Sequence, residues 1–279
     1  MARTHLLDCP IDSLSLQETV DEIIHRIRLG KPMQHCVVNT FKFLLMHKDP
    51  ILKSIVKNCD IINADGQSAV WALKLLRRPI KERVTGIDLM EALIERATRE
   101  NLSVYFFGAK APIVQSVFTL YKEKYPNLRI AGYHHGYFRR TGEEPLAVEK
   151  IRESRPDILF VALDSPRKEY WLGKYINELN VPFSMGVGGS FDVLAGHFPR
   201  APRWMQDHGL EWAWRLKEDP RRMWKRYLKS HTLFGWLIFR ELLGLSKNSA
   251  ASPGKPHTPD IRPAQGRHGK DKTTLAGRS

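Results

Sequence analysis

Residues 157–163 read DILFVAL, and six of these seven side chains are apolar. A short, nearly continuous apolar run of this kind is typical of a strand that is buried on both faces. Strands buried in this way occur in parallel sheets that helices cover from both sides. The run therefore predicts a buried parallel strand within an α/β fold.

Outward from this run, short β-rich segments alternate with helical patterns. Further strands are expected at residues 35–39, 60–63, 103–107, 128–131 and 182–187. Helices are expected at residues 41–46, 67–77, 87–100, 112–125 and 168–179. Alternation of this kind builds βαβ units, so the chain is predicted to form a mostly parallel sheet with helices on both faces.

Composition divides the chain into three parts. With 279 residues and 42% hydrophobic side chains, the sequence is not that of a wholly disordered protein. We predict an α/β body over 1–198, a basic, Trp-rich helical appendage over 199–245, and a disordered basic tail over 246–279. The net charge is +14, and the appendage and the tail each carry an excess of five Lys and Arg over Asp and Glu. An anionic partner is therefore expected to bind toward the C-terminus.

The appendage combines positive charge with aromatic residues. Five of the seven tryptophans lie between residues 204 and 236, and a basic cluster over 221–229 precedes an apolar run over 233–243. Basic residues with Trp and Phe, on a helix too short to span a bilayer, are typical of a segment that lies on a membrane surface. An amphipathic helix packed on the body and a nucleic-acid-binding face are the alternatives. The dense apolar run favours an anionic membrane over nucleic acid.

Several classes of site lack their usual sequence support. The three cysteines form no C-x-x-C pair, so we expect neither a disulfide framework nor a zinc cluster. We expect the protein to reside in a reducing compartment. There is no signal-peptide pattern, no run of about 20 apolar residues, and no Asp-x-Asp, dinucleotide, P-loop or serine-hydrolase motif. His134 and His135 are neighbours on a strand and point to opposite faces. We therefore expect neither a metal nor a cofactor.

Ligands of parallel sheets bind at the carboxyl ends of the strands, so the loops after the expected strands form the candidate site. Asn39 and Thr40 lie at the end of the first strand, and Asp65 lies between the second strand and a helix, next to Gly66. A carboxylate at this position is either a helix N-cap, which Asp favours, or a reactive group. The two roles are compatible, and the residues alone leave both open.

Three further loops carry glycine or charge. Gly108 would let backbone N–H groups approach a phosphate, although a simple turn also explains it. Residues 164–169 read DSPRKE, and a helix start with a salt bridge is the alternative to a binding loop. Gly188, Gly189 and Asp192 follow the last strand, where either a bound ligand or a tight turn requires glycine.

Together these motifs form a specific set. They include NADGQSAVWA at 63–72, ERVTGIDLM at 82–90, FFGAK at 106–110, GYHHGYF at 132–138, GVGGSFDVLAG at 186–196 and RAPRWMQDHGLEWAWRL at 200–216. From about residue 6 to about residue 243, the chain resembles the WecG/TagA/CpsF family of bacterial glycosyltransferases. The resemblance implies a Rossmann-like α/β fold with a C-terminal appendage that meets the membrane.

The resemblance also implies an activity. The family transfers a hexose, commonly N-acetylmannosamine or its uronic acid, from a UDP-sugar to a sugar on undecaprenyl diphosphate, for surface polysaccharides. The reaction inverts the anomeric centre and needs no metal. This implies a cytoplasmic protein that binds peripherally to the inner face of the membrane, with no nucleic-acid partner. Whether it forms a homo-oligomer is left open.

The resemblance assigns roles to individual residues. Asp65 matches the proposed base, and Asn39 a polar position near the sugar. The arginines expected to reach the diphosphate are Arg215, Arg221, Arg222 and Arg226. The other residues expected to bind substrate are Thr40, Gly108, Gly136, Tyr137, Lys168, Glu169, Gly188, Gly189 and Asp192. Two positions depart from the family pattern: Val37 replaces a Thr, and Lys168 replaces a Gln expected to touch the donor.

Three other functions remain as alternatives. A glucosyltransferase of exopolysaccharide assembly is the alternative within the family, because the cation at Lys168 suits a different hexose or one that carries a carboxylate. A basic nucleic-acid-binding module without catalysis is the alternative from another class. A nucleotide-sugar epimerase or dehydrogenase is disfavoured, since the dinucleotide fingerprint is absent.

Overall fold

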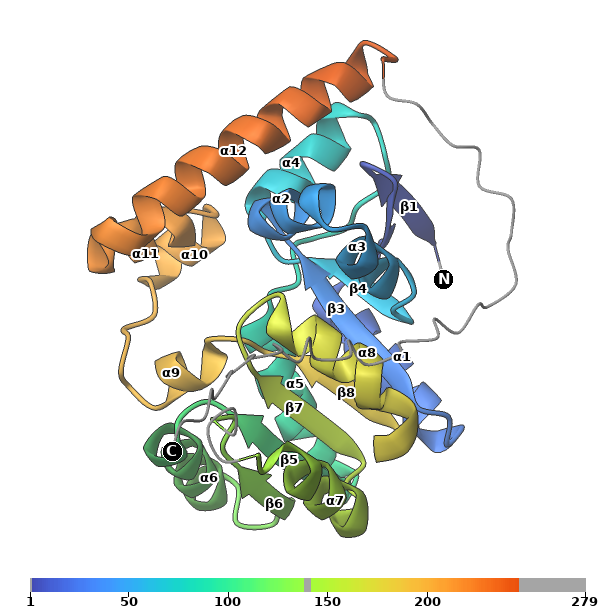
Figure 1. Ribbon diagram of the computed structural model, residues 1–279, viewed down its shortest axis with the longest axis vertical. Helices are drawn as coiled ribbons and strands as arrows, with labels where there is room; N and C mark the ends of the chain where they lie inside the picture. Colours follow the sequence, from blue (N-terminus) through green and yellow to red (C-terminus); the bar gives the residue numbers. More distant parts are fainter. Residues whose placement is uncertain (1, 138–141, 246–279) are drawn as a thin grey trace, which may run out of the picture. The chain divides into compact units, whose positions relative to one another are not determined.

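Six parallel strands form the central sheet of the computed structural model, which describes residues 2–137 and 142–245 (Figure 1). Their order across the sheet is β4-β3-β8-β7-β5-β6. The strands are β3 (Met33–Val38), β4 (Ile61–Ala64), β5 (Ser103–Gly108), β6 (Arg129–His134), β7 (Ile158–Ala162) and β8 (Phe183–Gly186). A separate antiparallel hairpin consists of β1 (Arg3–Leu6) and β2 (Cys9–Asp12).

Helices cover both faces of the sheet. On one face lie α1 (Leu16–Arg28), α5 (Gly86–Arg99), α6 (Ala111–Lys124) and α9 (Ser190–Leu194). On the other face lie α2 (Thr40–Lys48), α3 (Pro50–Lys57), α4 (Gln67–Leu75), α7 (Glu144–Ser154) and α8 (Arg167–Leu179). The chain then continues through α10 (Arg203–Asp207), α11 (Glu211–Glu218) and α12 (Pro220–Leu242).

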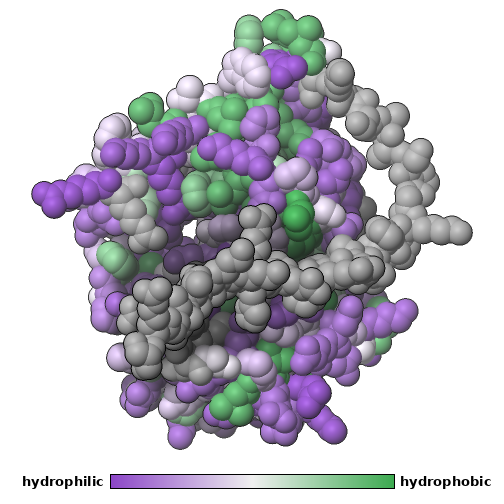
Figure 2. All heavy atoms as spheres, in the orientation of Figure 1, coloured by the Kyte–Doolittle hydropathy of each residue, from purple (hydrophilic) through white to green (hydrophobic). Residues whose placement is uncertain are grey.

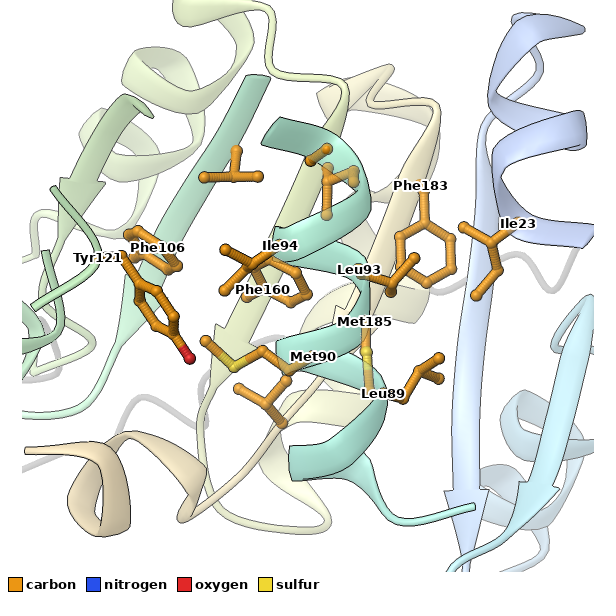
Figure 3. Close-up of a cluster of buried hydrophobic side chains, with 14 of the residues drawn as sticks. Ile23, Leu89, Met90, Leu93, Ile94, Phe106, Tyr121, Phe160, Phe183 and Met185 are labelled. Atoms are coloured by element: carbon orange, nitrogen blue, oxygen red, sulfur yellow. The ribbon is translucent and has the colours of Figure 1, made fainter. Parts of the chain in front are cut away.

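The DILFVAL run forms an inner strand of this sheet. β7 pairs with β5 on one side and with β8 on the other, in parallel. Phe160 packs among side chains of α5 and α6 on one face, as Figure 3 shows, whereas Leu159 and Val161 pack against α7 and α8 on the opposite face. The prediction of a mostly parallel α/β sheet with helices on both faces is confirmed.

Helix starts follow local capping signals. Ser15 and Glu18 form a reciprocal capping box at the start of α1, and Asp49 caps α3 in front of a proline. At α2, the Asn39 side chain accepts the N–H of Lys42 at 3.1 Å. These caps satisfy N–H groups that a helix end leaves without partners.

The appendage packs against the body through α12. Phe234 and Ile238 are buried in the same cluster as residues of α2, and the rings of Phe43 and Phe234 lie 5.4 Å apart. Arg78 of the body pairs with Glu241. Among the described residues, no helix has both the length and the apolar composition needed to cross a bilayer.

We expect Gly108→Ala to destabilise the fold by about 1–3 kcal/mol, because a non-glycine residue is strained at this backbone conformation. Gly108 has a φ of +114°, and a Cβ there would lie 2.5 Å from the carbonyl oxygen of Ala162. Urea unfolding measures the change. Gly235→Ala is the control, since a Cβ in the middle of α12 meets nothing within 4 Å, and we expect a small gain in stability there. Equal effects of the two substitutions on stability would contradict the requirement for glycine at residue 108.

Candidate active site

A crevice is expected where two neighbouring parallel strands send the chain to opposite faces of the sheet. β3 and β8 are such neighbours. The chain leaves β3 for α2 on one face and leaves β8 for α9 on the other. Asn39, Thr40 and Gly188 therefore lie around this switch point, and Asp65 follows β4, which pairs with β3.

Asp65 and Asn39 are the central pair of the site. The Nδ2 of Asn39 donates a hydrogen bond to Oδ2 of Asp65 at 3.2 Å. Gly66, not Asp65, is the N-cap residue of α4, and α4 has no side-chain cap. A Cβ on Gly66 would lie 3.1 Å from the Cβ of Asn39, so the two loops approach closely. The N-cap alternative for Asp65 is thus wrong, and the partly exposed carboxylate has its side-chain hydrogen bond from Asn39.

The turn between α10 and α11 lies against the start of α4. A Cβ on Gly209, which has a φ of +70°, would lie 2.4 Å from the Cγ of Gln67. Arg83 pairs with Glu211 of α11 and donates to the backbone oxygen of Gln206 at 2.9 Å. The N–H of Val84 in turn bonds the oxygen of Ala64 at the end of β4. These contacts hold the appendage next to the Asp65 loop.

α12 brings a guanidinium and a phenol to the same region. The Arg226 guanidinium lies 3.7 Å from the centroid of the Phe41 ring in the first turn of α2. The Tyr227 ring packs edge-on against Trp212 of α11, with ring centroids 6.2 Å apart. Burial raises the pKa of the Tyr227 phenol. Arg215 and Arg226 lower that pKa, and Asp65 raises it, so all three charges lie close enough to act on the hydroxyl.

A buried ionic cluster joins α2 to α8. Glu169 pairs with Lys42, and its Oε1 lies 2.8 Å from the Nζ of Lys168. The Lys168 ammonium also bonds Ser165, and the Lys42 Nζ lies 3.3 Å from the Sγ of Cys36. Burial would raise the pKa of Glu169, but the two lysines together lower it to about 2. The carboxylate is therefore held ionised between the first turns of α2 and α8, the helices that follow β3 and β7.

Glycines let the loops after β5, β6 and β7 pack closely. A Cβ on Gly136 would lie 2.4 Å from Cδ2 of Leu163 and 2.9 Å from Cα of Gly108. The N–H of Gly136 also bonds the oxygen of Ala109 at 2.9 Å. Gly108 and Gly136 are thus required by the packing of these loops, whereas the Tyr137 side chain beside them is 61% exposed.

The loop after β8 is more open. Gly188 has a φ of +54°, and a Cβ on Gly189 would meet nothing within 4 Å. Asp192 lies in the first turn of α9. Burial raises the pKa of its carboxyl, His197 opposes this rise and Asp164 adds to it. The carboxyl ends of β7 and β8 thus carry acidic groups beside open glycines.

Comparison with known proteins identifies this arrangement. A family model described as "Glycosyl transferase WecG/TagA/CpsF family" matches residues 4–248. The chain belongs to this family. It is a glycosyltransferase, and the family resemblance noted in the sequence is confirmed.

Several named relatives of this glycosyltransferase come from species of Bacillus and Staphylococcus. A Bacillus spizizenii protein is 33% identical over 221 residues, covering 79% of this chain and 81% of its own. A Bacillus subtilis protein is 32% identical over 214 residues, which cover 77% of this chain and 81% of the relative. A Staphylococcus aureus protein is 33% identical over 186 residues, which cover 66% of this chain and 70% of the relative. Each is named N-acetylglucosaminyldiphosphoundecaprenol N-acetyl-beta-D-mannosaminyltransferase.

The structure of the glycosyltransferase brings some of the predicted residues together. Asn39 contacts Asp65 directly, and the Arg215 and Arg226 charges act on a phenol that Asp65 also influences. Arg221 is exposed at the start of α12, and the Arg222 side chain lies outside what the structure describes. Lys168 and Glu169 face each other inside the protein.

Three residues of the candidate site of this glycosyltransferase were not singled out in the sequence. Lys42 is the buried partner of Glu169, Arg83 ties the appendage to the body, and Tyr227 lies among the appendage arginines. Arg83 is part of the ERVTGIDLM motif, which was an available signal. There was no comparable signal in the sequence for Lys42 or Tyr227, because the residues that they meet, such as Glu169 for Lys42, are distant in the chain.

Proposed function

We propose that this glycosyltransferase moves N-acetylmannosamine, or a related hexose, from a UDP-sugar to an N-acetylglucosamine carried on undecaprenyl diphosphate. The reaction would invert the anomeric centre, need no metal and serve cell-surface polysaccharide synthesis. The Asp65–Asn39 pair at the strand ends, beside the arginines of the appendage, carries the proposal. The names of the relatives supply the donor sugar and the acceptor.

In this mechanism Asp65 acts as general base. Its carboxylate accepts the proton of the acceptor hydroxyl as that oxygen bonds to the anomeric carbon. The bond from that carbon to the UDP oxygen breaks on the opposite face, and UDP leaves with the electron pair. General base catalysis of this kind contributes about 10²–10⁴-fold. Asn39 orients the carboxylate through its hydrogen bond.

Arginines would stabilise the charge that develops on the leaving diphosphate. Guanidinium groups bind phosphate oxygens with two parallel hydrogen bonds. Arg215 and Arg226 lie on the appendage, and their charges, like that of Asp65, act on the Tyr227 phenol. We assign this role to the arginines, because the Arg226 guanidinium lies 3.7 Å from the centroid of the Phe41 ring, two residues after Asn39. Among the residues that the structure describes, no group of three or more His, Cys, Asp or Glu could hold a metal ion.

A UDP-release assay across a panel of UDP-sugars tests the proposal, with a short-chain polyprenyl diphospho-N-acetylglucosamine as acceptor. We expect acceptor-dependent release of UDP from UDP-N-acetylmannosamine in the presence of a chelator. Release from UDP-glucose instead would favour the exopolysaccharide alternative. Absence of release with every donor, together with tight salt-sensitive binding of nucleic acid, would overturn the proposal in favour of a binding module.

We also propose that the outward face of α12 binds the cytoplasmic face of an anionic membrane. Phe234 and Ile238 of the apolar run pack on the body, so only part of that run remains for lipid. The exposed apolar residues near this face are Trp224, Leu228, Trp236, Phe239, Leu242, Leu243 and Leu245. In Figure 2 hydrophobic side chains gather at the upper, C-terminal end of α12. Exposed Lys225 and Lys229 on the same helix suit anionic headgroups.

We expect the double substitution Trp236→Glu and Phe239→Glu to weaken binding to anionic vesicles at least tenfold. Each aromatic side chain contributes about 1.5–3 kcal/mol when it leaves water, and a carboxylate would repel the headgroups. Cosedimentation with phosphatidylglycerol vesicles measures the effect. Leu29→Glu with Leu146→Glu, two exposed leucines outside the appendage, is the control and should leave binding intact. Equal loss in both variants would contradict the α12 surface.

A further inference from the structure

Tyr227 is a polar group beside the site that the mechanism above does not use. Its ring is held between two neighbours, Trp212 at 6.2 Å and His231 at 5.5 Å between centroids, and both meet it nearly edge-on. Its hydroxyl makes no hydrogen bond to any side chain or backbone group of the described residues. The ring is thus fixed while the hydroxyl remains available.

The charges around this hydroxyl are those of the proposed reaction centre. Arg215 from α11 and Arg226 from α12 both act on the phenol, and so do the carboxylates of Asp65 and Glu211. Arg226 is itself placed against Phe41, two residues after Asn39. Trp212, which meets the Tyr227 ring, lies about one helical turn before Arg215 on α11, and Arg226 packs on the helix that follows Asn39. The phenol and the two cations that would hold a diphosphate therefore belong to the same region of the appendage.

The protonation state of the phenol determines what it can bind. Burial is the largest influence and raises the pKa of the phenol above its ordinary value, although the two arginines lower it by more than the two carboxylates raise it. The group therefore remains a neutral O–H donor at neutral pH. A hydroxyl donor in the same region as two guanidiniums suits an oxygen of a phosphate group, because phosphate oxygens accept several charge-assisted hydrogen bonds at once.

We propose that the Tyr227 hydroxyl donates a hydrogen bond to a substrate diphosphate oxygen and completes an anion site with Arg215 and Arg226. This inference rests on the proposed function, because it requires a diphosphate substrate. Two diphosphates are present in the proposed reaction, one in the UDP-sugar and one in the lipid acceptor. The hydroxyl binds one of them, and kinetics separate the two.

The test is Tyr227→Phe in the full-length protein, which keeps the ring contacts and removes only the hydroxyl. We expect kcat/KM to fall roughly ten- to hundredfold, the range for a hydrogen bond to a charged group. A rise in KM for the lipid acceptor alone assigns the hydroxyl to the lipid diphosphate. A rise in KM for the UDP-sugar alone assigns it to UDP. Tyr125→Phe, at the far end of α6, is the matched control and should retain wild-type kinetics.

Two further measurements separate this inference from its alternatives. Calorimetric binding of UDP and of a short-chain polyprenyl diphosphate compares wild type with Tyr227→Phe independently of turnover. Unchanged affinities and kinetics would overturn the inference while leaving the proposed function intact. A loss accompanied by a lower melting temperature or weaker vesicle binding would also overturn it, because the hydroxyl would then act through the fold. A wild type that binds these diphosphates but transfers no sugar would contradict the proposed function alone.

Discussion

Asp65→Asn is expected to lower kcat by about 10²–10⁴-fold, because an amide cannot accept the proton of the acceptor hydroxyl. The substitution keeps the shape of the side chain, and an amide oxygen can still accept the hydrogen bond from Asn39. We therefore expect the KM for the UDP-sugar and the melting temperature to stay close to those of wild type. Steady-state UDP release with a saturating acceptor measures the change in kcat.

Asp21→Asn provides the matched control. Asp21 is an exposed carboxylate of α1 that pairs with Arg96 at 3.0 Å, and it lies outside the site. We expect its variant to turn over at the wild-type rate. If Asp65→Asn retained more than a tenth of wild-type kcat, Asp65 would not be the base, whatever the donor sugar.

Glu169→Gln is expected to destabilise the protein by about 3–5 kcal/mol, because it removes the anion from a buried cluster of charges. Glu169 is the only carboxylate described as paired with Lys42, and Lys168 lies 2.8 Å from the same oxygen. Without it, the Lys42 and Lys168 amines would lie in the protein interior without a carboxylate counter-charge. The free energy of unfolding from urea titration measures the loss.

Two further variants make this result specific to the cluster. Glu178→Gln, at an exposed position of the same helix, should change stability by less than about 0.5 kcal/mol. Adding Lys42→Met to Glu169→Gln should recover part of the lost stability, since one unpaired charge is then removed as well. A loss below about 1 kcal/mol for Glu169→Gln would show that the cluster is hydrated and not a buried pair.

The same cluster gives stability a dependence on pH. The lysines lower the pKa of Glu169 from 4.5 to about 2 in the folded protein. The unfolded state therefore binds more protons between these values, and stability falls as pH falls from about 4.5 to about 2. We expect the wild type to lose stability over this range by more than Glu169→Gln does. Parallel curves of unfolding free energy against pH for the two proteins would show that Glu169 is not the source of this pH dependence.

Much of the fold could be predicted because hydrophobic periodicity is a local property. The strand expected at 103–107 is β5 extended by one residue, and the helix expected at 112–125 is α6 displaced by one. The elements of the body that were not predicted are β1, β2, α1, α3, α7 and α9. Signals for α1 were present, namely the Ser15–Glu18 capping box and buried residues at helical spacing. β1 and β2 have only four residues each, too few for a clear period.

The candidate site was predicted less completely than the fold. The rule that ligands bind at the carboxyl ends of strands selected the loops that hold Asn39 and Asp65. It did not distinguish an N-cap from a carboxylate that faces Asn39. Nor did it show that Lys168 and Glu169 are both buried, because charged residues at the start of a helix usually face solvent.

By itself, the sequence determined the class of the fold, the edge of the sheet that carries the candidate site, and the concentration of charge and tryptophan in the appendage. The tertiary structure decided which groups meet: Arg226 with Phe41, Gly209 with Gln67, and Phe234 with the body instead of lipid. The physical reason is that strand and helix patterns depend on neighbours a few residues away. Contacts between distant segments depend on the direction in which whole helices pack, and no local pattern encodes that direction.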